Sequence, residues 1–284
     1  MNHPDPGLDI AALRALRGRR TPAPTRHLLE RIENHLEAHD GYLAFSGGKD
    51  SLVVAHLVRQ VDPALPITWF DSGLEYPEHR AYILDLAEQW KLNLDIIRAQ
   101  PTALEILEAS GAWSHAAPRA TVPDLTRTLI DIPAGTAHDR HGPGELWGVR
   151  AAESRGRARL YATALRREIR TSCSCCPGSP TTVTSERRRR HGGIISRRNG
   201  TTAYGPLWDW STDDVWTYLA AHDIPPSPIY AKLTALGAPE QALRISTLIT
   251  ATGLENGRIT WLRAGWPQLY TELLESLPRL AEFA

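Results

Sequence analysis

The chain has 284 residues, of which 42% are hydrophobic, and its 32 basic side chains balance its 32 acidic ones. A chain of this size and composition can bury a core, which excludes a disordered tail. Its zero formal charge excludes a general attraction to nucleic acid or membranes, so any attraction to polyanions must come from local patches. No stretch approaches the roughly 18 apolar residues of a membrane span, and the three cysteines lie between 173 and 176, so we expect a cytoplasmic protein with no disulfide framework and no membrane contact.

The predicted elements begin with two helices, over 8–16 and 27–36, where apolar residues recur at helical spacing. A helix is also expected from Pro77 to about Trp90, because proline suits the first helical position. Short apolar segments predict strands at 41–45, 67–70, 92–99 and 144–150. Strands that alternate with helices predict an α/β fold, with a parallel, doubly wound, Rossmann-like sheet and helices on both faces.

The chain is expected to divide into three parts. Residues 1–39 form N-terminal helices, 40–222 form the α/β domain with an inserted loop at about 171–203, and 223–284 form a mostly helical C-terminal extension. Ser211 and Asp214 have the spacing of a capping box, which predicts a helix start near the end of the α/β domain. Ligands of such sheets lie beyond the carboxyl ends of the strands.

The turn after the first strand reads SGGKDS, residues 46–51. Gly47 and Gly48 let the backbone approach a ligand, and the helix that follows presents the positive end of its dipole, so phosphate is the expected ligand. Lys49 adds a mobile positive charge, and Asp50 is expected to bind Mg²⁺ that bridges phosphates. Ser46 and Ser51 add hydroxyl donors. The spacing differs from that of the longer Walker loop.

This turn resembles the pyrophosphate-binding loop of the ATP pyrophosphatases, the PP-loop family, which cleaves ATP between its α and β phosphates. The segment TWFDSGLEYPEHRAYI resembles the second-strand motif of the phosphoadenosine phosphosulfate reductase branch, in which Asp71, Ser72 and Gly73 match the DTG element. LWGVRAAESRGRARLY is similar to the arginine motif of that branch and places Arg150 and Arg155 near phosphate oxygens. The resemblance covers roughly residues 40–230 and implies that these residues bind ATP.

The resemblance leaves two reactions. A sulfonucleotide reductase attacks the sulfur of its substrate with a cysteine near the C-terminus, and no cysteine follows Cys176 in this sequence. We therefore expect ATP chemistry, in which an acceptor oxygen attacks the α-phosphorus and pyrophosphate departs. The expected catalytic residues are Lys49, Asp50 and Arg150, and we expect Lys49 and Asp50 at a solvent-facing helix start.

The expected inserted loop contains the densest group of arginines. Six of them lie within twelve residues, enough for several phosphate contacts on a nucleic acid: Arg187, Arg188, Arg189, Arg190, Arg197 and Arg198. The alternative is a solvated run of charge in a chain that is rich in arginine.

The same segment contains every cysteine of the chain: Cys173, Cys175 and Cys176. One interpretation is a zinc or iron–sulfur site with a histidine such as His138, His141 or His191 as a further ligand. A second is a persulfide relay, and a third is incidental thiols.

Nucleotide activation, cysteines and basic side chains together favour sulfur incorporation. The chain resembles the ATP pyrophosphatases of DNA phosphorothioation systems, which implies a DNA backbone phosphate as acceptor and a cysteine desulfurase as sulfur donor, although a well-spaced cluster of four cysteines is missing. The alternatives are a sulfonucleotide reductase, an ATP sulfurylase that adenylates sulfate, a flavin-adenylate synthetase, a tRNA thiolase and a nucleotide-binding scaffold without turnover. The sequence does not indicate an oligomeric state.

Overall fold

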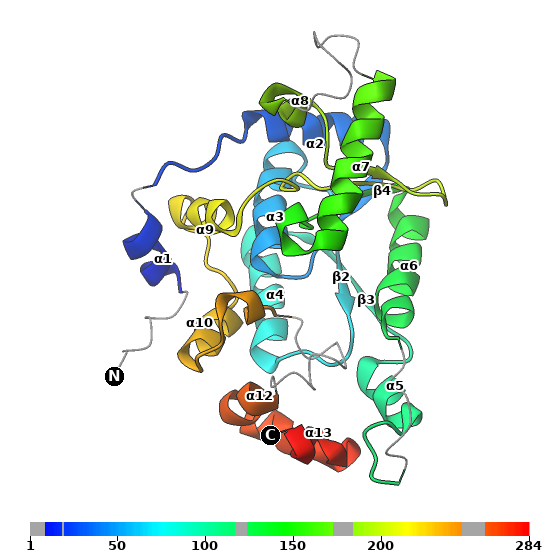
Figure 1. The fold of residues 1–284 in the computed structure, drawn as a ribbon, viewed down its shortest axis with the longest axis vertical. Helices are drawn as coiled ribbons and strands as arrows, with labels where there is room; N and C mark the ends of the chain where they lie inside the picture. The colour runs from blue at the N-terminus through cyan, green and yellow to red at the C-terminus, as the bar shows by residue number, and fades with distance from the viewer. Residues whose placement is uncertain (1–8, 19, 117–123, 173–183, 246–258, 284) are drawn as a thin grey trace.

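The computed structural model describes residues 9–18, 20–116, 124–172, 184–245 and 259–283. Within these ranges, no helix is both long enough and apolar enough to cross a membrane. Figure 1 shows a central sheet with helices along both sides and the last helices of the chain at one end of the molecule.

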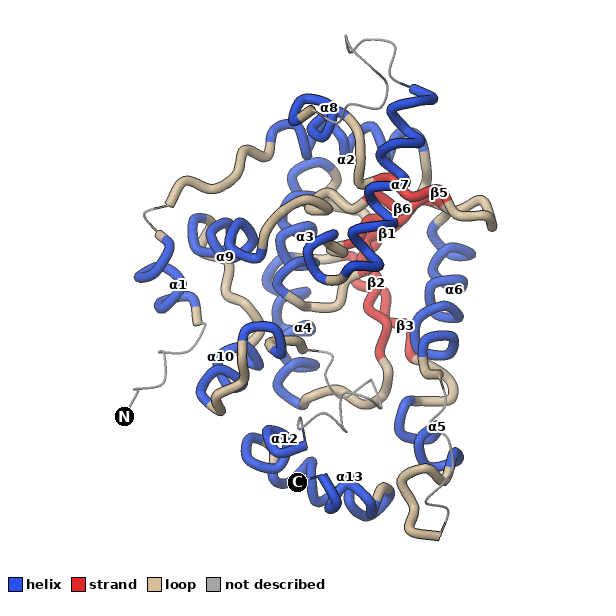
Figure 2. Tube along the Cα trace, viewed as in Figure 1, coloured by secondary structure: helices blue, strands red, loops and turns tan. Residues whose placement is uncertain are grey.

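The sheet has six strands in the order β3-β2-β1-β4-β6-β5. Every neighbouring pair is parallel except β5 and β6, which are antiparallel. Figure 2 shows the strands as one band between the helices. This confirms the predicted Rossmann-like α/β fold. The strands are β1 (Gly41–Ala44), β2 (Pro66–Asp71), β3 (Asn93–Arg98), β4 (Gly144–Trp147), β5 (Ile194–Ser196) and β6 (Thr202–Tyr204).

The helices include those that the sequence predicts at the N-terminus and after Pro77 and Ser211. Short helical turns also occur at Arg127–Asp131, Ala151–Glu153, Glu240–Ala242 and Pro278–Phe283. The α-helices are α1 (Ile10–Arg17), α2 (Arg26–Ala38), α3 (Lys49–Val61), α4 (Pro77–Trp90), α5 (Ala103–Ser110), α6 (Ile132–His141), α7 (Arg155–Ser172), α8 (Ser185–Arg190), α9 (Thr212–Ala221), α10 (Pro228–Ala235), α12 (Ile259–Gly265) and α13 (Pro267–Ser276).

Two successive residues of β1 show that helices cover both faces of the sheet. Leu43 belongs to the main apolar core, which includes Leu52 of α3. Tyr42 points to the opposite face, because successive side chains of a strand alternate, and it packs with Ala137 of α6. The main core also includes Leu273 of α13, so the C-terminal helices pack against the same core as the sheet.

The segment expected as an inserted loop at about 171–203 contains regular structure. It contributes α8 and the edge strand β5, and β6 begins within it at Thr202. Strand β6 pairs with β4, where Tyr204 lies opposite Leu146, and therefore extends the parallel sheet by one strand. The expectation of a loop was wrong for residues 185–190, 194–196 and 202–203.

Candidate functional site

Three predicted site segments follow the ends of neighbouring strands. Residues 46–51 come after β1, residues 71–73 begin at the end of β2, and residues 148–150 come after β4. The chain leaves β1 toward β2 and β3, and then returns to place β4 on the other side of β1. The turn at 46–51 therefore lies at the switch point of the strand order, where ligands of open α/β sheets bind.

Two glycines shape the turn. Gly47 has a φ of +70°, and a Cβ atom there would lie 2.6 Å from Cε1 of His79. A Cβ atom on Gly148 would lie 2.5 Å from the backbone nitrogen of Ser51, so the segment after β4 packs directly against the first turn of α3. The hydroxyl oxygens of Ser46 and Ser51 are 3.2 Å apart. Gly47 thus permits the backbone conformation of the turn, and Gly148 permits the close approach of the segment after β4 to the start of α3.

Charged side chains surround the start of α3. The ammonium group of Lys49 is 2.6 Å from one carboxylate oxygen of Asp50, and Nε of Arg150 is 2.5 Å from the other. Arg150 also donates to the carbonyl oxygen of Trp210 at 3.0 Å and to the hydroxyl of Thr212 at 3.2 Å. The three predicted catalytic residues therefore form one connected group.

Neither Lys49 nor Asp50 is solvent-facing, contrary to the expectation from sequence. The side chain of Asp50 is 15% exposed, that of Lys49 is 13% exposed, and Arg150 is 2% exposed. A buried guanidinium needs a negative partner, and Asp50 supplies it. Asp50 therefore supports the fold as well as facing the turn. If Lys49 turns away from Asp50, the carboxylate of Asp50 still pairs with Arg150.

His79 supports the turn from α4, a role that the sequence did not reveal. Burial lowers the pKa of His79 to about 4, so its ring is neutral near pH 7. Nε2 lies 2.9 Å from the carbonyl oxygen of Ser46, and Nδ1 lies 3.3 Å from the hydroxyl of Ser227. The neutral ring donates to Ser46 through Nε2 and accepts from Ser227 through Nδ1.

Tyr230 of α10 lies directly against the turn. Its hydroxyl accepts a hydrogen bond from the backbone N–H of Lys49 at 3.0 Å. A Cβ atom on Gly48 would lie 3.4 Å from this hydroxyl and 3.3 Å from Cδ1 of Ile245. Residues from the C-terminal extension thus cover the turn, and sequence spacing alone could not have indicated them.

The DSG segment forms a tight turn after β2. Asp71 is 3% exposed; one of its oxygens accepts from the N–H of Gly73 at 2.9 Å and the other from Arg80 at 2.7 Å. Gly73 has a φ of +75°, which again favours glycine. The described contacts assign Asp71 to holding this turn, which lies beside the loop after β1.

Glu75 follows this turn and is a further ionisable group that the sequence did not single out. Burial raises the pKa of its carboxyl to about 7, although a hydrogen bond from Ser72 opposes this shift. The hydroxyl of Ser72 donates to Glu75 at 2.8 Å. Near neutral pH the carboxyl is therefore partly protonated, at the same edge of the sheet as the phosphate loop.

The remaining predicted arginines divide into exposed and internally paired groups. Arg155 is exposed at the first position of α7, and the ion pairs described for Asp50 are with Lys49 and Arg150. Arg187 is buried, at 3% exposure, and Arg197 is 2.5 Å from Glu145. Among the other four, Arg188 lies 3.6 Å from Asp209 and Arg190 lies 2.8 Å from Glu186, while Arg189 and Arg198 are exposed.

The predicted cysteine site lies outside the described residues, because Cys173, Cys175 and Cys176 belong to 173–183. Within the part of the chain that the structure describes, no group of three or more histidine, cysteine, aspartate or glutamate side chains is arranged to hold a metal ion. His191, one of the expected ligands, instead contacts Glu168 at 3.3 Å.

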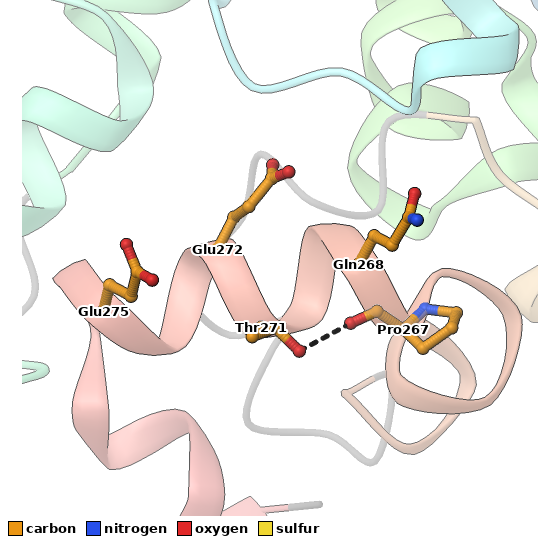
Figure 3. Close-up of a pocket in the computed structure, with 5 residues that line it drawn as sticks. All are labelled: Pro267, Gln268, Thr271, Glu272 and Glu275. Atoms are coloured by element: carbon orange, nitrogen blue, oxygen red, sulfur yellow. Dashed lines mark hydrogen bonds between the residues drawn. The ribbon is translucent and has the colours of Figure 1, made fainter.

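Two hollows on the surface lie away from the turn. Figure 3 shows the first, along α13, where the hydroxyl of Thr271 donates to the carbonyl oxygen of Pro267 at 2.9 Å. The second lies at the amino ends of β1 and β2, beside Asp40 and Pro66. None of the residues predicted to bind ATP lines either hollow, and His141, a candidate metal ligand from the sequence, lines the second.

Comparisons with known proteins agree on one family. The family model for the phosphoadenosine phosphosulfate reductase domain matches residues 41–238. A phosphoadenosine 5'-phosphosulfate reductase of Xanthomonas oryzae pv. oryzae is 27% identical over 198 residues, which cover 67% of this chain and 66% of that protein, just under two thirds of its length. The enzyme of the same name from a Synechococcus species is 27% identical over 192 residues, covering 66% of this chain and 68% of that protein.

A solved structure is also similar. The phosphoadenylyl-sulfate reductase of Candida auris, determined as a phosphate complex, matches with a TM-score of 0.46 at 15% identity, over 80% of this chain and 90% of that chain.

Proposed function

This chain belongs to the phosphoadenosine phosphosulfate reductase domain family, and on that premise we propose that it is an enzyme that cleaves ATP between the α and β phosphates and adenylates an acceptor oxygen. The observation that carries the proposal is the group of Lys49, Asp50 and Arg150 at the start of α3. Two cations share one carboxylate there, at the positive end of a helix dipole, which favours a polyphosphate.

Each residue of the group has a separate part in the reaction. The acceptor oxygen attacks the α-phosphorus; the bond from this phosphorus to the α–β bridging oxygen breaks, and pyrophosphate leaves with that electron pair. Lys49 turns from Asp50 toward the leaving group and offsets its growing charge, together with the N–H groups of the turn. Arg150 holds Asp50 in place, and the rigid turn contributes by positioning the phosphates.

The residues fit Mg²⁺ as a companion of ATP. Nucleotide-bound Mg²⁺ takes one or two carboxylates and completes its shell with phosphates and water. Asp50 offers one carboxylate at the loop, and no preformed cluster of ligands is present among the described side chains. Asp50 would hold the ion, which supplies neutralisation of phosphate charge when it is bound.

For the acceptor we propose a phosphate of a nucleic-acid backbone. The chain as a whole is neutral, but ten arginines and two glutamates lie between Arg155 and Arg190. This local excess of positive charge begins five residues after Arg150 and supports an anionic polymer as acceptor more than a small neutral one.

A sulfonucleotide reductase is the second candidate, and the named relatives favour it. In such an enzyme a thiolate would attack the sulfur of phosphoadenosine phosphosulfate, the bond from this sulfur to the phosphate oxygen would break, and adenosine 3',5'-bisphosphate would leave with that electron pair. The three cysteines that could supply the thiolate lie outside the described residues. The two candidates share the phosphate loop and differ in the nucleotide that is consumed and in the product that is released.

The test measures pyrophosphate release from ATP with Mg²⁺, alone and with duplex DNA, tRNA, sulfate or flavin mononucleotide. We expect release that DNA stimulates, that Lys49→Ala abolishes and that Lys91→Asn preserves, because Lys91 is exposed at the end of α4. A parallel reaction contains phosphoadenosine phosphosulfate and a dithiol reductant. Sulfite release there, without pyrophosphate release from ATP under any condition, would replace the proposal by the reductase.

A further inference from the structure

Helix α7 carries a line of exposed arginines. Arg155, Arg159, Arg166 and Arg170 occupy positions i, i+4, i+11 and i+15, which lie along one side of a helix. We call these four side chains the α7 stripe. All four are exposed, and Tyr161, Leu165 and Ile169 on another side of α7 are buried. At 1.5 Å per residue, the stripe is about 22 Å long.

The α7 stripe is not neutralised within the described chain. None of its four guanidinium groups forms an ion pair with a carboxylate among the residues that the structure describes. Glu168 of the same helix contacts Arg31 at 3.8 Å and accepts from the N–H of Gly192 at 2.7 Å. Glu168 therefore engages its carboxylate with Arg31 and Gly192 and leaves the α7 stripe without a carboxylate partner.

We propose that the α7 stripe binds the phosphate backbone of a nucleic acid. A row of arginines with no carboxylate partner among the described residues matches a polymer with a regular row of negative charges, and duplex DNA carries about one charge per 1.7 Å of its axis. An anionic membrane is disfavoured, because Leu160, at 43% exposure, is the one large apolar side chain of α7 that is strongly exposed. The stripe starts just after the Arg150 segment, so a bound strand would run toward the phosphate loop. This inference rests on the nucleic-acid acceptor proposed above.

The experiment measures binding of fluorescently labelled duplex and single-stranded DNA over a range of salt concentrations, without ATP. The test variant is Arg159→Gln/Arg166→Gln. The control is Arg26→Gln/Arg263→Gln, which removes two exposed charges from α2 and α12. We expect the test variant to lower the slope of log affinity against log salt by about 1.8 on duplex or about 1.4 on single strands, and the control to leave it unchanged.

Equal affinity and slope in the test variant and the wild type would overturn the proposal, as would binding to anionic vesicles with none to either DNA. Because no ATP is present, loss of binding and loss of pyrophosphate release are separate results. A protein that binds DNA through the stripe but does not cleave ATP would retain this inference and lose the proposed reaction.

A different observation carries a second inference, at the phosphate loop itself. Tyr230 is 2% exposed, and Trp216 contacts its ring edge-on with centroids 5.2 Å apart. Its hydroxyl accepts the N–H of Lys49, so its own proton stays available to donate. Burial raises the pKa of Tyr230, which keeps that proton in place.

We propose that Tyr230 is a positioning residue that donates a hydrogen bond to a phosphate oxygen of the bound nucleotide. This proposal also rests on the proposed function. Tyr230→Phe removes the hydroxyl and keeps the ring, and Tyr218→Phe is the matched control, because its buried hydroxyl lies 2.9 Å from His56 Nδ1. Calorimetry should show about tenfold weaker binding of ATP by Tyr230→Phe, with binding of adenosine unchanged.

The control should bind ATP like the wild type, and both variants should keep their melting temperature within a few degrees. Equal loss of ATP affinity in both variants, or an equal loss for ATP and adenosine in Tyr230→Phe, would show a structural role and overturn the proposal. Binding is measured without turnover, so absence of pyrophosphate release alone does not decide this result.

Discussion

Replacing Asp50 by asparagine will test whether the predicted catalytic group also supports the fold. Asparagine keeps an oxygen near the Nε atom of Arg150 but loses the negative charge, and Arg150 is 2% exposed. Breaking a buried ion pair by removing one partner costs about 3–5 kcal/mol. Because asparagine retains one acceptor, we expect the lower limit, about 3 kcal/mol, which lowers the melting temperature by roughly 6–12 °C in a domain of this size.

Thermal unfolding followed by circular dichroism measures this loss, with Lys49→Ala as the comparison. Lys49→Ala leaves Asp50 paired with Arg150 and should cost about 1 kcal/mol, although it abolishes turnover. Asp50→Asn/Arg150→Met removes both charges and should recover at least half of the loss. A melting temperature for Asp50→Asn within about 2 °C of the wild type, or a double variant worse than the sum of the single ones, would refute the reasoning.

Three further predictions concern pH and packing. The folded pKa of Glu75 is raised to about 7, so the stability of the wild type relative to Glu75→Gln should fall as pH rises from about 4.5 to 7. Urea unfolding of both proteins at pH 5 and pH 8 measures this, and an equal difference in unfolding free energy at the two pH values would contradict it. The folded pKa of His79 is lowered to about 4, so its contribution should be lost as pH falls from about 6.5 to 4, and His79→Gln should flatten that part of the urea profile. Gly148→Ala places a Cβ atom 2.5 Å from the backbone nitrogen of Ser51 and should cost about 1–3 kcal/mol of stability and weaken ATP binding. The control is Gly135→Ala in α6, where a Cβ atom would have nothing within 4 Å and should not destabilise the protein. Equal melting temperatures of the two variants would exclude the clash.

The sequence predicts the part of the fold that repeats a local pattern. The strands that end before the turn at 46–51 and at Asp71 are apolar and stand between clear helices, so their period and order indicate the parallel sheet. Strands β5 and β6 have three residues each, too short for a recognisable period, and they form because β6 finds a partner in β4. Helix α6 contains Pro133 and Gly135, which hide its helical pattern.

The candidate site divides in the same way. Gly47, Gly48, Lys49 and Asp50 lie in one six-residue turn, so the sequence alone predicts that this turn binds phosphate. His79 and Tyr230 reach that turn from 33 and 181 residues away, through contacts that depend on the packing of α4 and α10. The burial of Asp50 could not be predicted either, because Arg150, its partner, comes from a strand end a hundred residues along the chain.

The order of the strands leaves β3 at an edge of the described sheet, where free backbone groups invite pairing with another copy of the chain. Ile96 of β3 is 36% exposed, which adds to that tendency. Asp95 counters it, because its carboxylate pairs with Arg140 at 2.9 Å and lies 2.8 Å from His141, and so places charged and polar groups against the edge. Substitution of Asp95 by an apolar residue should therefore favour edge-to-edge aggregation during expression, although Asp95 lies outside the candidate site.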